Sequence, residues 1–327
     1  MPRVAAVEPV GRRVVIRRQV GGEGGLPGDA GGHRPPRYAD VVGVLVAAGP
    51  SVLSVRRRDG TVVDVPRSAV CALKPVPAAP ADVLALEEVA ALGWPAPQTR
   101  WLGRWLLRAA AGWTGRANSV LPLGDPGLPL DAALAEVLRW YAERGLPGRV
   151  VIPTPAREAL DAALGDRGWT AYSPTRVLTA DVQVTLRRMP ERAGLPPVRM
   201  EPDPSEDWLA AYHYRGGSDL PPVARSILTG SAEPGFAIVR SGGLAVAIAR
   251  ASLDRGWVGV TAVEVDPDFR RQGLASHVMR GVLRWAADRG ASDAYLQVAE
   301  ENAAALGLYD RLGFALHHRY RYRLAPG

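Results

Sequence analysis

The chain has 327 residues, of which 47% are hydrophobic and 22% charged, a balance typical of globular protein with more than one domain. No apolar run approaches the ~20 residues that cross a bilayer, and no apolar stretch with a cleavage site opens the chain, so we expect a cytoplasmic protein without a membrane span. The formal net charge is +7, and residues 1–78 carry +6 of it, with 12 Lys and Arg against 6 Asp and Glu.

The first 78 residues are predicted to form a small all-β domain. Four short β-branched segments carry this prediction, at residues 12–18, 40–48, 51–58 and 61–67. Asp59-Gly60 between the last two is a hairpin signal. We expect about five strands to close into a barrel similar to Src-homology-3-like barrels. The Gly- and Pro-rich residues 21–37 are interpreted as a long loop, and residues 74–82 as a linker.

The charge of this domain suggests a partner that carries phosphates. One interpretation is weak nucleic-acid binding by residues 1–78, through Arg12, Arg13, Arg17, Arg18, Arg56, Arg57 and Arg58. The alternative is a solvated face in an arginine-rich protein, because Lys74 is the only lysine among 40 basic residues, a bias typical of GC-rich genomes.

The single cysteine, Cys71, lies in an apolar, strand-like segment. We expect a small buried hydrophobic side chain there, and one cysteine forms no internal disulfide. No Cys or His spacing in the chain indicates a metal site.

Residues 83–190 are predicted to form an α/β domain in which helices and strands alternate. Its expected elements are two strands around Gly112, a helix over 130–145, a strand at 149–153, a helix over 156–165 and a strand within 168–182. The apolar face of the first helix is predicted to comprise Leu134, Val137, Leu138 and Tyr141.

Residues 196–327 are predicted to form a second α/β domain after a Pro-rich joint. It is expected to begin with a strand and two short helices, followed by strands at 235–241, 243–253 and 256–265. A helix over 273–289, a strand at 294–298, a helix over 302–312 and a strand at 314–324 complete it.

Two stretches indicate that this architecture occurs twice. Residues 137–145 read "VLRWYAERG" and residues 282–290 read "VLRWAADRG", so seven of nine letters agree at a spacing of 145 residues. At the same spacing Gly168-Trp169 falls on Gly313-Phe314. A duplication accounts for both matches, and chance likeness between amphipathic helices is the alternative.

The stretch "VEVDPDFRRQGLASHV", residues 263–278, predicts an anion site. A β-branched strand runs into a basic loop that opens a long helix, so successive backbone N–H groups converge on one anion. Gly273 permits close approach, Ala275 leaves the first turn open, and Arg270 and Arg271 add charge. A diphosphate or a similar anion is the ligand implied.

The same residues resemble a known family. "RRQGLA" fits the Arg/Gln-x-x-Gly-x-Gly/Ala signature of the GNAT superfamily of N-acetyltransferases, and "AYLQVAEENAAALGLYDRLGF" is similar to the strand, Asn-x-x-Ala-x-x-Leu-Tyr run and Gly-Phe that follow in the family. The resemblance covers about residues 198–325. The whole layout also resembles an actinobacterial group labelled N-acetylglutamate-synthase-like, with a small N-terminal β-barrel.

The resemblance implies roles for particular residues toward acetyl-coenzyme A (acetyl-CoA). Main-chain groups of Val263 and Val265 pair with the pantetheine arm, and Asn302 contacts the same arm unless it serves only as a helix cap. Tyr309 is the general acid that protonates the departing thiolate, and a core tyrosine is the alternative. The pyrophosphate is held by Arg270, Arg271, Gln272, Gly273, Leu274, Ala275 and Ser276.

The general base is less well marked. Related enzymes often carry a glutamate in the strand before the Asn helix, whereas this chain has Gln297. Glu264 is our candidate, and a water chain, Glu300 or His213 are alternatives. Four further side chains are expected either to line the acceptor pocket or to lie on a solvated edge strand: His317, His318, Tyr320 and Tyr322.

The first copy is predicted to be inactive. Asp125 replaces an arginine, Pro126 and Pro129 donate no N–H, Leu128 stands for Gly273, and Leu164 stands for Tyr309. We therefore expect an internal pseudo-dimer that binds one acetyl-CoA per chain, with residues 196–327 able to bind it alone.

The sequence thus predicts a degenerate and a catalytic GNAT domain in tandem after a small barrel. The expected reaction is transfer of acetyl from acetyl-CoA to a primary amine, of a small molecule such as an amino acid or of a protein, by direct attack. A nucleic-acid-associated regulator that senses acetyl-CoA without turnover is the alternative from a different class.

Overall fold

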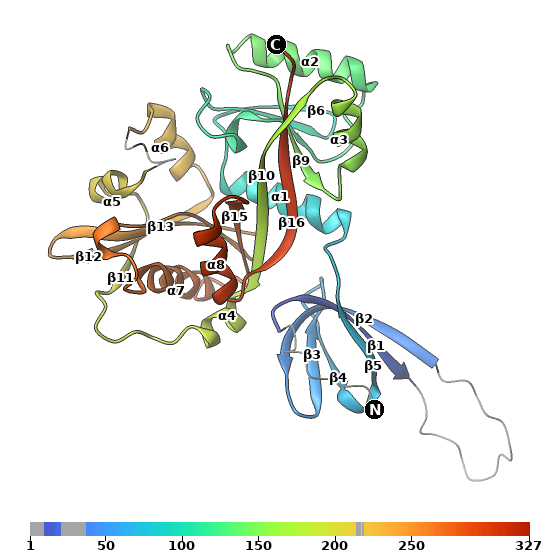
Figure 1. Cartoon of the computed structure of the whole chain (residues 1–327), viewed down its shortest axis with the longest axis vertical. Helices are drawn as coiled ribbons and strands as arrows, with labels where there is room; N and C mark the ends of the chain where they lie inside the picture. Colours follow the sequence, from blue (N-terminus) through green and yellow to red (C-terminus); the bar gives the residue numbers. More distant parts are fainter. Residues whose placement is uncertain (1–9, 21–36, 214–216, 218) are drawn as a thin grey trace, which may run out of the picture. The chain divides into compact units, whose positions relative to one another are not determined.

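A computed structural model describes residues 10–20, 37–213, 217 and 219–327 (Figure 1). The chain divides into two compact units, Met1–Ala78 and Ala79–Gly327. Most of the predicted loop 21–37 lies outside the described residues. Within the described part of the chain, none of the helices has both the length and the apolar character needed to cross a membrane.

The first unit contains an antiparallel sheet of five strands in the order β4-β3-β2-β1-β5. The strands are β1 (Arg13–Val20), β2 (Arg37–Ala48), β3 (Val52–Arg56), β4 (Val62–Pro66) and β5 (Val70–Pro75). Gly60, with a φ of 85°, turns the β3–β4 hairpin as predicted. The number of strands agrees with the sequence, and the likeness to Src-homology-3-like barrels stays a prediction.

Cys71 departs from its prediction, because its side chain is exposed. β5 is an edge strand that packs Val70 and Leu73 against the core of the first unit. In the pairing with β1, Arg17 lies opposite Ala72 and Arg18 opposite Val70, so Cys71 falls at a bulge between these two pairs, and its side chain is exposed. The expectation of a buried cysteine is therefore wrong.

The second unit is built on one sheet of eight strands, in the order β11-β12-β13-β14-β15-β10-β16-β9. The strands are β9 (Arg149–Thr154), β10 (Thr170–Asp181), β11 (Val198–Glu201), β12 (Glu233–Ser241), β13 (Leu244–Asp254), β14 (Trp257–Val265), β15 (Asp293–Ala299) and β16 (Ala315–Leu324). A smaller sheet holds β6 (Gln98–Leu102), β7 (Trp105–Ala109) and β8 (Leu121–Pro122). A parallel bridge between Val120 and Val150 joins this small sheet to β9.

Helices cover both faces of the large sheet. They are α1 (Pro80–Gly93), α2 (Leu130–Ala142), α3 (Glu158–Gly165), α4 (Val182–Arg188), α5 (Glu206–Ala211), α6 (Pro222–Thr229), α7 (Leu274–Ala287) and α8 (Ala303–Arg311). On β13, Ala247 and Ala249 join the core under α7, whereas Ile248 between them joins the core under α5 and α6. The alternation of a strand thus supplies both layers.

The two halves of this unit exchange a strand. β10 of the first half lies between β15 and β16 of the second, and β16 lies between β10 and β9 of the first (Figure 1). Thr175 pairs with Tyr320, and these residues are 145 positions apart, so the centre of the exchange pairs a residue with its own counterpart. The predicted ranges 83–190 and 196–327 are therefore two halves of one sheet.

Backbone details repeat at the same spacing. The N–H of Trp169 donates to the carbonyl of Leu164 at 3.0 Å, and the N–H of Phe314 donates to that of Tyr309 at 2.9 Å. Gly168 and its counterpart Gly313 both adopt positive φ, at 77° and 90°. Each glycine ends a helix in a conformation that other residues avoid, which accounts for the shared Gly-aromatic pair. The structure supports the predicted duplication.

Of two local expectations in the first half, one is confirmed and one is wrong. Strands β7 and β8 lie on either side of Gly112 and pair antiparallel, as predicted, and a further hairpin turns at Gly103, between β6 and β7. Gly112 lies in the next loop, where its N–H and that of Ala110 donate to Asn118 Oδ1 at 2.9 and 2.8 Å. Leu138, predicted to face the core, is 40% exposed, because α2 buries the side that carries Val137 and Tyr141.

Candidate active site in the second half

β14 separates from its neighbour partway along its length. It pairs in parallel with β15 from Trp257 to Val260, and no pairing with β15 continues beyond that residue. On the other side its register with β13 shifts between Thr261 and Glu264, which leaves a bulge at Ala262, where φ is 52°. The β15-facing edge after Val260 is thus open to an extended ligand, and Val263 and Val265 lie on this segment as predicted.

The basic loop opens α7 as predicted. Gly273 is the N-cap of α7, with φ 87° and ψ 5°, and no side chain caps the first turn. Arg271 also has positive φ, 62°. The helix therefore presents unsatisfied N–H groups and positive charge at one place, the arrangement that binds phosphate oxygens.

Sequence reasoning missed a third arginine beside this loop. A Cβ built at Gly273 would collide with the guanidinium of Arg192, which comes from the Pro-rich joint before β11. Arg192 lies about 80 positions from the loop in sequence, and only the folded chain brings the two together. Of the predicted loop residues, Leu274 is buried in the core under α7, whereas Arg270, Arg271 and Gln272 are exposed.

Tyr309 of α8 lies in the same core, 8% exposed, with its ring 5.8 Å from that of Phe314. Burial raises the pKa of its phenol to about 12. Among the described residues the hydroxyl has no hydrogen-bond partner. A phenol in this state keeps its proton at neutral pH and is free to donate it. Both earlier interpretations, core residue and acid, are compatible with this placement.

Glu264 and His213 were separate candidates for the base, and the structure brings them into contact. The backbone N–H of His213 donates to Glu264 Oε1 at 3.0 Å, and His213 Nδ1 lies 3.4 Å from Oε2. Partial burial raises the pKa of Glu264, although the contacts with His213 oppose that rise. A carboxylate of raised pKa at the bulge is suited to accept a proton.

Glu300 is less suited to that role. Arg319 Nε donates to its Oε1 at 2.8 Å and Arg176 Nε at 3.2 Å, and these bonds lower the pKa of the carboxyl. Gln297, where relatives often carry glutamate, accepts from Arg116 Nη1 at 2.9 Å and from the Tyr320 hydroxyl at 3.4 Å. Arg116 belongs to the first half, which therefore contacts the second half at this position.

Asn302 caps α8, because its Oδ1 accepts from the N–H of Ala305 at 3.0 Å. A contact with acetyl-CoA stays a prediction. The alternative that β16 is a solvated edge strand is wrong, since β16 is interior to the sheet. His318, Tyr320 and Tyr322 on it are buried, and His318 Nε2 lies 2.8 Å from Glu87 Oε1 of α1. The acceptor role predicted for His317, His318, Tyr320 and Tyr322 stays a prediction.

The corresponding place in the first half is built differently. Val120 pairs with Val150 and α2 begins at Leu130, ten residues on; in the second half Gly259 pairs with Tyr295 and α7 begins at Leu274, fifteen residues on. The shorter loop contains Pro126 and Pro129, which donate no N–H, so it offers fewer backbone donors for a phosphate. The N–H of Gly127, in this loop, donates to Asp125 Oδ1 at 2.7 Å.

The arginines of the first unit are only partly available to a phosphate. Arg17 forms an ion pair with Asp40, with Nε 2.9 Å from Oδ1, and Arg13 Nη1 donates to the carbonyl of Pro77 at 2.6 Å. Arg12, Arg57 and Arg58 are exposed. Nucleic-acid binding by residues 1–78 stays a prediction.

Comparison with known proteins identifies the family of the chain. A family described as "Probable histone acetyltransferase Rv0428c C-terminal" matches residues 80–323. The probable histone acetyltransferase Rv0428c of Mycobacterium tuberculosis is 32% identical over 296 residues, which cover 89% of this chain and 90% of that protein.

Solved structures share the fold. A GCN5-related N-acetyltransferase from Kribbella flavida superposes with a TM-score of 0.58 at 19% identity, over 75% of this chain and 96% of that one. A tandem GNAT protein from the clavulanic acid biosynthesis pathway superposes with a TM-score of 0.54 at 13% identity, over 77% of this chain and 91% of that one. The second of these has the tandem arrangement that the 145-residue spacing predicts.

Proposed function

The chain belongs to the GNAT superfamily of N-acetyltransferases, in the family of the Rv0428c C-terminal region, and from this premise we propose that its second half transfers acetyl from acetyl-CoA to a protein amine. The observation that carries the proposal is the basic loop at α7 beside the open edge of β14, with Tyr309 nearby in the same core. The first half has no such combination.

The residues present suit acetyl-CoA. The N–H groups at the start of α7, with Arg270, Arg271 and Arg192, supply charge and donors for the pyrophosphate. Main-chain groups of Val263 and Val265 offer hydrogen bonds to the amides of the pantetheine arm. Arg270 Nε donates to the Val265 carbonyl at 3.3 Å, and this bond must break before the carbonyl can accept from the arm. When bound, acetyl-CoA supplies an activated acyl group as a thioester.

Glu264 and Tyr309 carry out the two proton transfers of the reaction. The attacking amine must be neutral, and Glu264 takes a proton from it, either directly or through His213. The nitrogen forms its bond to the acyl carbon, the carbon–sulfur bond breaks, and the phenol of Tyr309 gives its proton to the sulfur. The phenol is protonated throughout the neutral range and can therefore supply this proton, although the burial that raises its pKa also makes it a weaker acid.

The first half borders the acceptor side. Its Trp113 and the second half's Ile248 belong to one hydrophobic cluster. Ala262 of the bulge packs against this cluster. Arg116 from the same loop is bonded to Gln297. We favour a protein amine over a free amino acid because the relative that covers nearly the whole chain is described as a probable histone acetyltransferase.

The test is thiol release with basic proteins, free amino acids and polyamines as acceptors, as a function of pH. A base works only when deprotonated, so kcat/KM is lost as pH falls through the pKa of Glu264, which partial burial raises from its ordinary value. Glu264→Gln should remove that limb and lower kcat/KM by ~10². Glu300→Gln is the matched control and should keep it.

An unchanged pH profile in Glu264→Gln would show that another group is the base. Acetyl-CoA binding without thiol release from any acceptor would instead favour the sensing regulator.

A further inference from the structure

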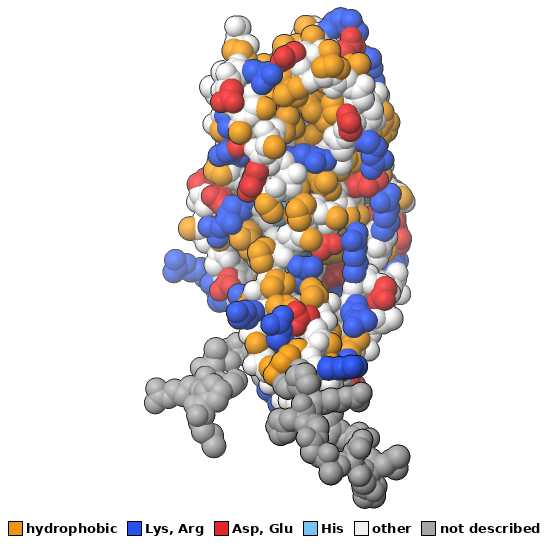
Figure 2. Space-filling view, turned by 90° about the vertical axis from the view of Figure 1, so that its right-hand side faces the viewer, with side chains coloured by type: hydrophobic (Ala, Val, Ile, Leu, Met, Phe, Trp, Pro, Cys, Tyr) orange, Lys and Arg blue, Asp and Glu red, His pale blue; other side chains and the backbone are white. Residues whose placement is uncertain are grey.

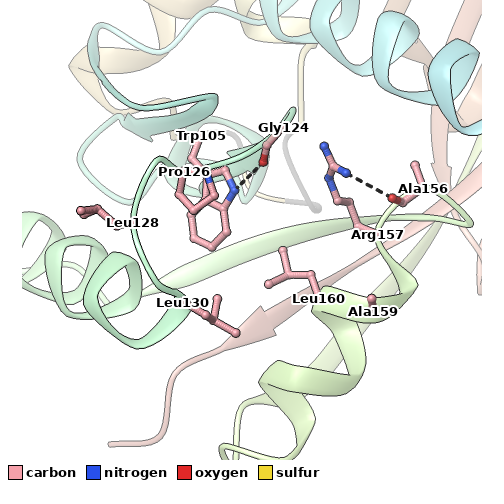
Figure 3. Close-up of a pocket in the computed structure, with 9 residues that line it drawn as sticks. All are labelled: Trp105, Gly124, Pro126, Leu128, Leu130, Ala156, Arg157, Ala159 and Leu160. Carbon is pink, nitrogen blue, oxygen red and sulfur yellow. Dashed lines mark hydrogen bonds between the residues drawn. The ribbon is translucent and has the colours of Figure 1, made fainter.

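The first half contains a cavity of about 330 Å³ that the proposed reaction does not use (Figure 3). It lies between the loop that leads into α2 and the start of α3, with Trp105 of β7 on one side. Its lining consists of Trp105, Gly124, Pro126, Leu128, Leu130, Ala156, Arg157, Ala159 and Leu160. The volume is at the lower end of the range for small-molecule sites.

The cavity occupies the place that corresponds to the cofactor site of the second half. At the 145-residue spacing Leu128 corresponds to Gly273 and Arg157 to Asn302. The chemistry of the place has changed, because its lining is apolar apart from backbone groups and one cation. Pro126 and Pro129 provide no N–H, so a diphosphate is not the ligand that fits.

Arg157 is the single charged side chain in this lining. Its Nε donates to the carbonyl of Pro122 at 2.6 Å. Its Nη1 donates to the carbonyl of Ala156 at 3.4 Å, the bond drawn in Figure 3. Partial burial lowers the pKa of the guanidinium. Among the described residues Arg157 has no carboxylate partner. Since a guanidinium carries five N–H groups, three donors remain for a ligand.

The mouth of the cavity faces solvent. Leu128 is 41% exposed and Ala159 is exposed. Hydrophobic side chains gather on the upper part of the face in Figure 2, the part of the molecule that the first half occupies. A ligand can therefore enter without unfolding α3, and its apolar body would leave water for an apolar wall.

We propose that this cavity binds a small monocarboxylate with a compact apolar body, such as an arylacetate. The carboxylate pairs with the free N–H groups of Arg157, and the body lies against Trp105, Leu130 and Leu160. The planar guanidinium of Arg157 matches the geometry of a planar carboxylate. One guanidinium also neutralises the single charge of a carboxylate, whereas it would neutralise only half the charge of a phosphate dianion.

The test uses ligand-observed NMR and calorimetry on the full chain with phenylacetate, hexanoate and the neutral phenylacetamide. Phenylacetate should bind at millimolar concentration or tighter, and the amide at least about tenfold more weakly, since a hydrogen bond to a charged group is the stronger one. Equal binding of acid and amide, or no binding by either acid, overturns the proposal.

Variants locate the ligand. Ala159→Trp should close the mouth and weaken phenylacetate binding by at least about tenfold, without touching a hydrogen bond of Arg157. Ala162→Trp, on an exposed position of the same helix outside the lining, is the matched control and should bind within about twofold of the native chain. Unaltered binding in Ala159→Trp would contradict the assignment.

Arg157→Gln tests the anchor and should also lose about tenfold. A second pair of measurements separates this site from the cofactor slot. Acetyl-CoA should not displace phenylacetate, and Gly273→Asp, designed to disable the phosphate loop, should bind phenylacetate as the native chain does. Displacement by acetyl-CoA would place the carboxylate in the second half and overturn the proposal.

Discussion

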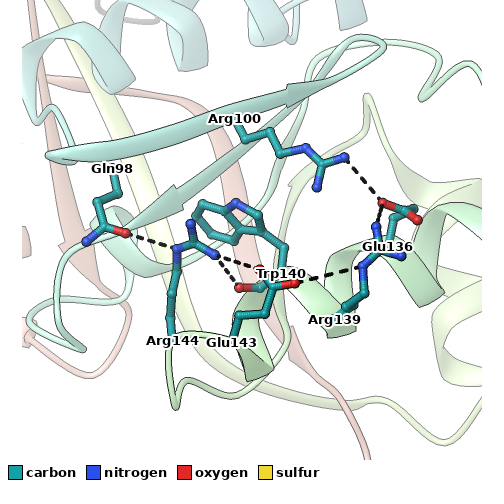
Figure 4. A network of polar contacts seen from close by, with 7 residues as sticks. All are labelled: Gln98, Arg100, Glu136, Arg139, Trp140, Glu143 and Arg144. Carbon is teal, nitrogen blue, oxygen red and sulfur yellow. Dashed lines mark hydrogen bonds and ion pairs between the residues drawn. The ribbon is translucent and has the colours of Figure 1, made fainter.

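Arg144 lies 3.8 Å from the ring centre of Trp140 at the end of α2, and Arg289 lies 4.6 Å from that of Trp285 at the end of α7, 145 residues further on. Both arginines donate from Nη1 to the carbonyl of their own tryptophan. Each also donates from Nε to the first residue of a strand, Gln98 Oε1 of β6 or Glu233 Oε1 of β12 (Figure 4 shows the α2 member). The two helices are thus held to their sheets by the same kinds of contact.

The loops before these helices do not match. The second half has a basic loop with an αL glycine at residue 273, and the first half has a loop that is five residues shorter and contains two prolines. Tyr309 is replaced by the fully buried Leu164. Contacts that hold helix to sheet are common to both halves, whereas contacts suited to a phosphate are present in one.

The exchange of β10 and β16 explains why the first half remains whole. Each exchanged strand completes the sheet of the other half, so loss of the first half would open the edge of β15. The first half is therefore free to change its loops but not its strands. The predictions below test this division between scaffold and site.

The largest effect should follow from separating the halves. Residues 79–195 and 196–327 expressed alone should each fail to fold, because each lacks the strand that the other supplies. Expressed together, they should assemble and bind acetyl-CoA. Amide NMR dispersion of each fragment and of the mixture decides this.

This prediction revises the expectation that residues 196–327 alone bind acetyl-CoA. A well-dispersed spectrum from that fragment, with acetyl-CoA bound, would show that the exchange is dispensable.

A second test compares the two loops. Gly273→Asp places a carboxylate where N–H groups and arginines converge, and should weaken acetyl-CoA binding by at least ~10², or ~2.7 kcal/mol. Leu128→Asp makes the same change at the corresponding, exposed position of the first half and should leave affinity unchanged. Calorimetry should give one acetyl-CoA per native chain, and two per chain would contradict the comparison.

A third test compares two buried tyrosines. Tyr309→Phe should lower kcat by ~10² with little change in acetyl-CoA affinity, because the ring stays and only the proton is lost. With a pKa of about 12 the phenol remains protonated through neutral pH, so the loss should be the same from pH 6 to pH 9.

The matched control is Tyr141→Phe in the first half. The Tyr141 hydroxyl donates to the carbonyl of Arg108 at 2.9 Å, so its removal should cost about 1 kcal/mol of the free energy of unfolding and leave kcat unchanged. Turnover of Tyr309→Phe equal to that of the native enzyme would remove the phenol from the mechanism.

Much of the second half could be predicted from the sequence, because its signals are local. Hydrophobic periodicity marked each strand and helix from residue 198 onward, and the phosphate loop is a contiguous run in which a glycine needs positive φ. Glu264 and His213 could be named only as two separate candidates, since they are 51 positions apart in the sequence.

What the sequence did not reveal depends on tertiary choices. The alternating pattern of residues 170–181 is compatible with pairing to strands of either half. The sequence of β10 therefore does not show that it pairs with β15 and β16 of the second half. Arg192 reaches Gly273 from a Pro-rich segment without a motif. Cys71 and Leu138 were misassigned because an apolar neighbourhood does not say which side of an edge strand or of a helix faces solvent.

The smallest effect concerns the arginine contacts that hold α2 and α7 to their sheets. Arg144→Met and Arg289→Met keep an apolar stem over the indole but remove the charge and its hydrogen bonds. Each should lower the free energy of unfolding by about 1 kcal/mol, the usual size of a partly exposed cation–π contact with its hydrogen bond. Arg144→Met should cost the more, since its guanidinium lies nearer the ring and is less exposed, with 28% of its side chain accessible against 43% for Arg289.

Arg139→Met is the control for this pair, because Arg139 makes only exposed ion pairs with Glu136 and Glu143 on the same helix (Figure 4). Such pairs contribute about 0.5 kcal/mol or less. Thermal unfolding resolves the difference, at roughly 2–4 °C per kcal/mol for a unit of this size. Arg144→Met and Arg289→Met share no contact partner, so their effects on the free energy of unfolding should add. A loss in one half without a loss in the other would mean that the repeated contact supports the fold in only one of its two copies.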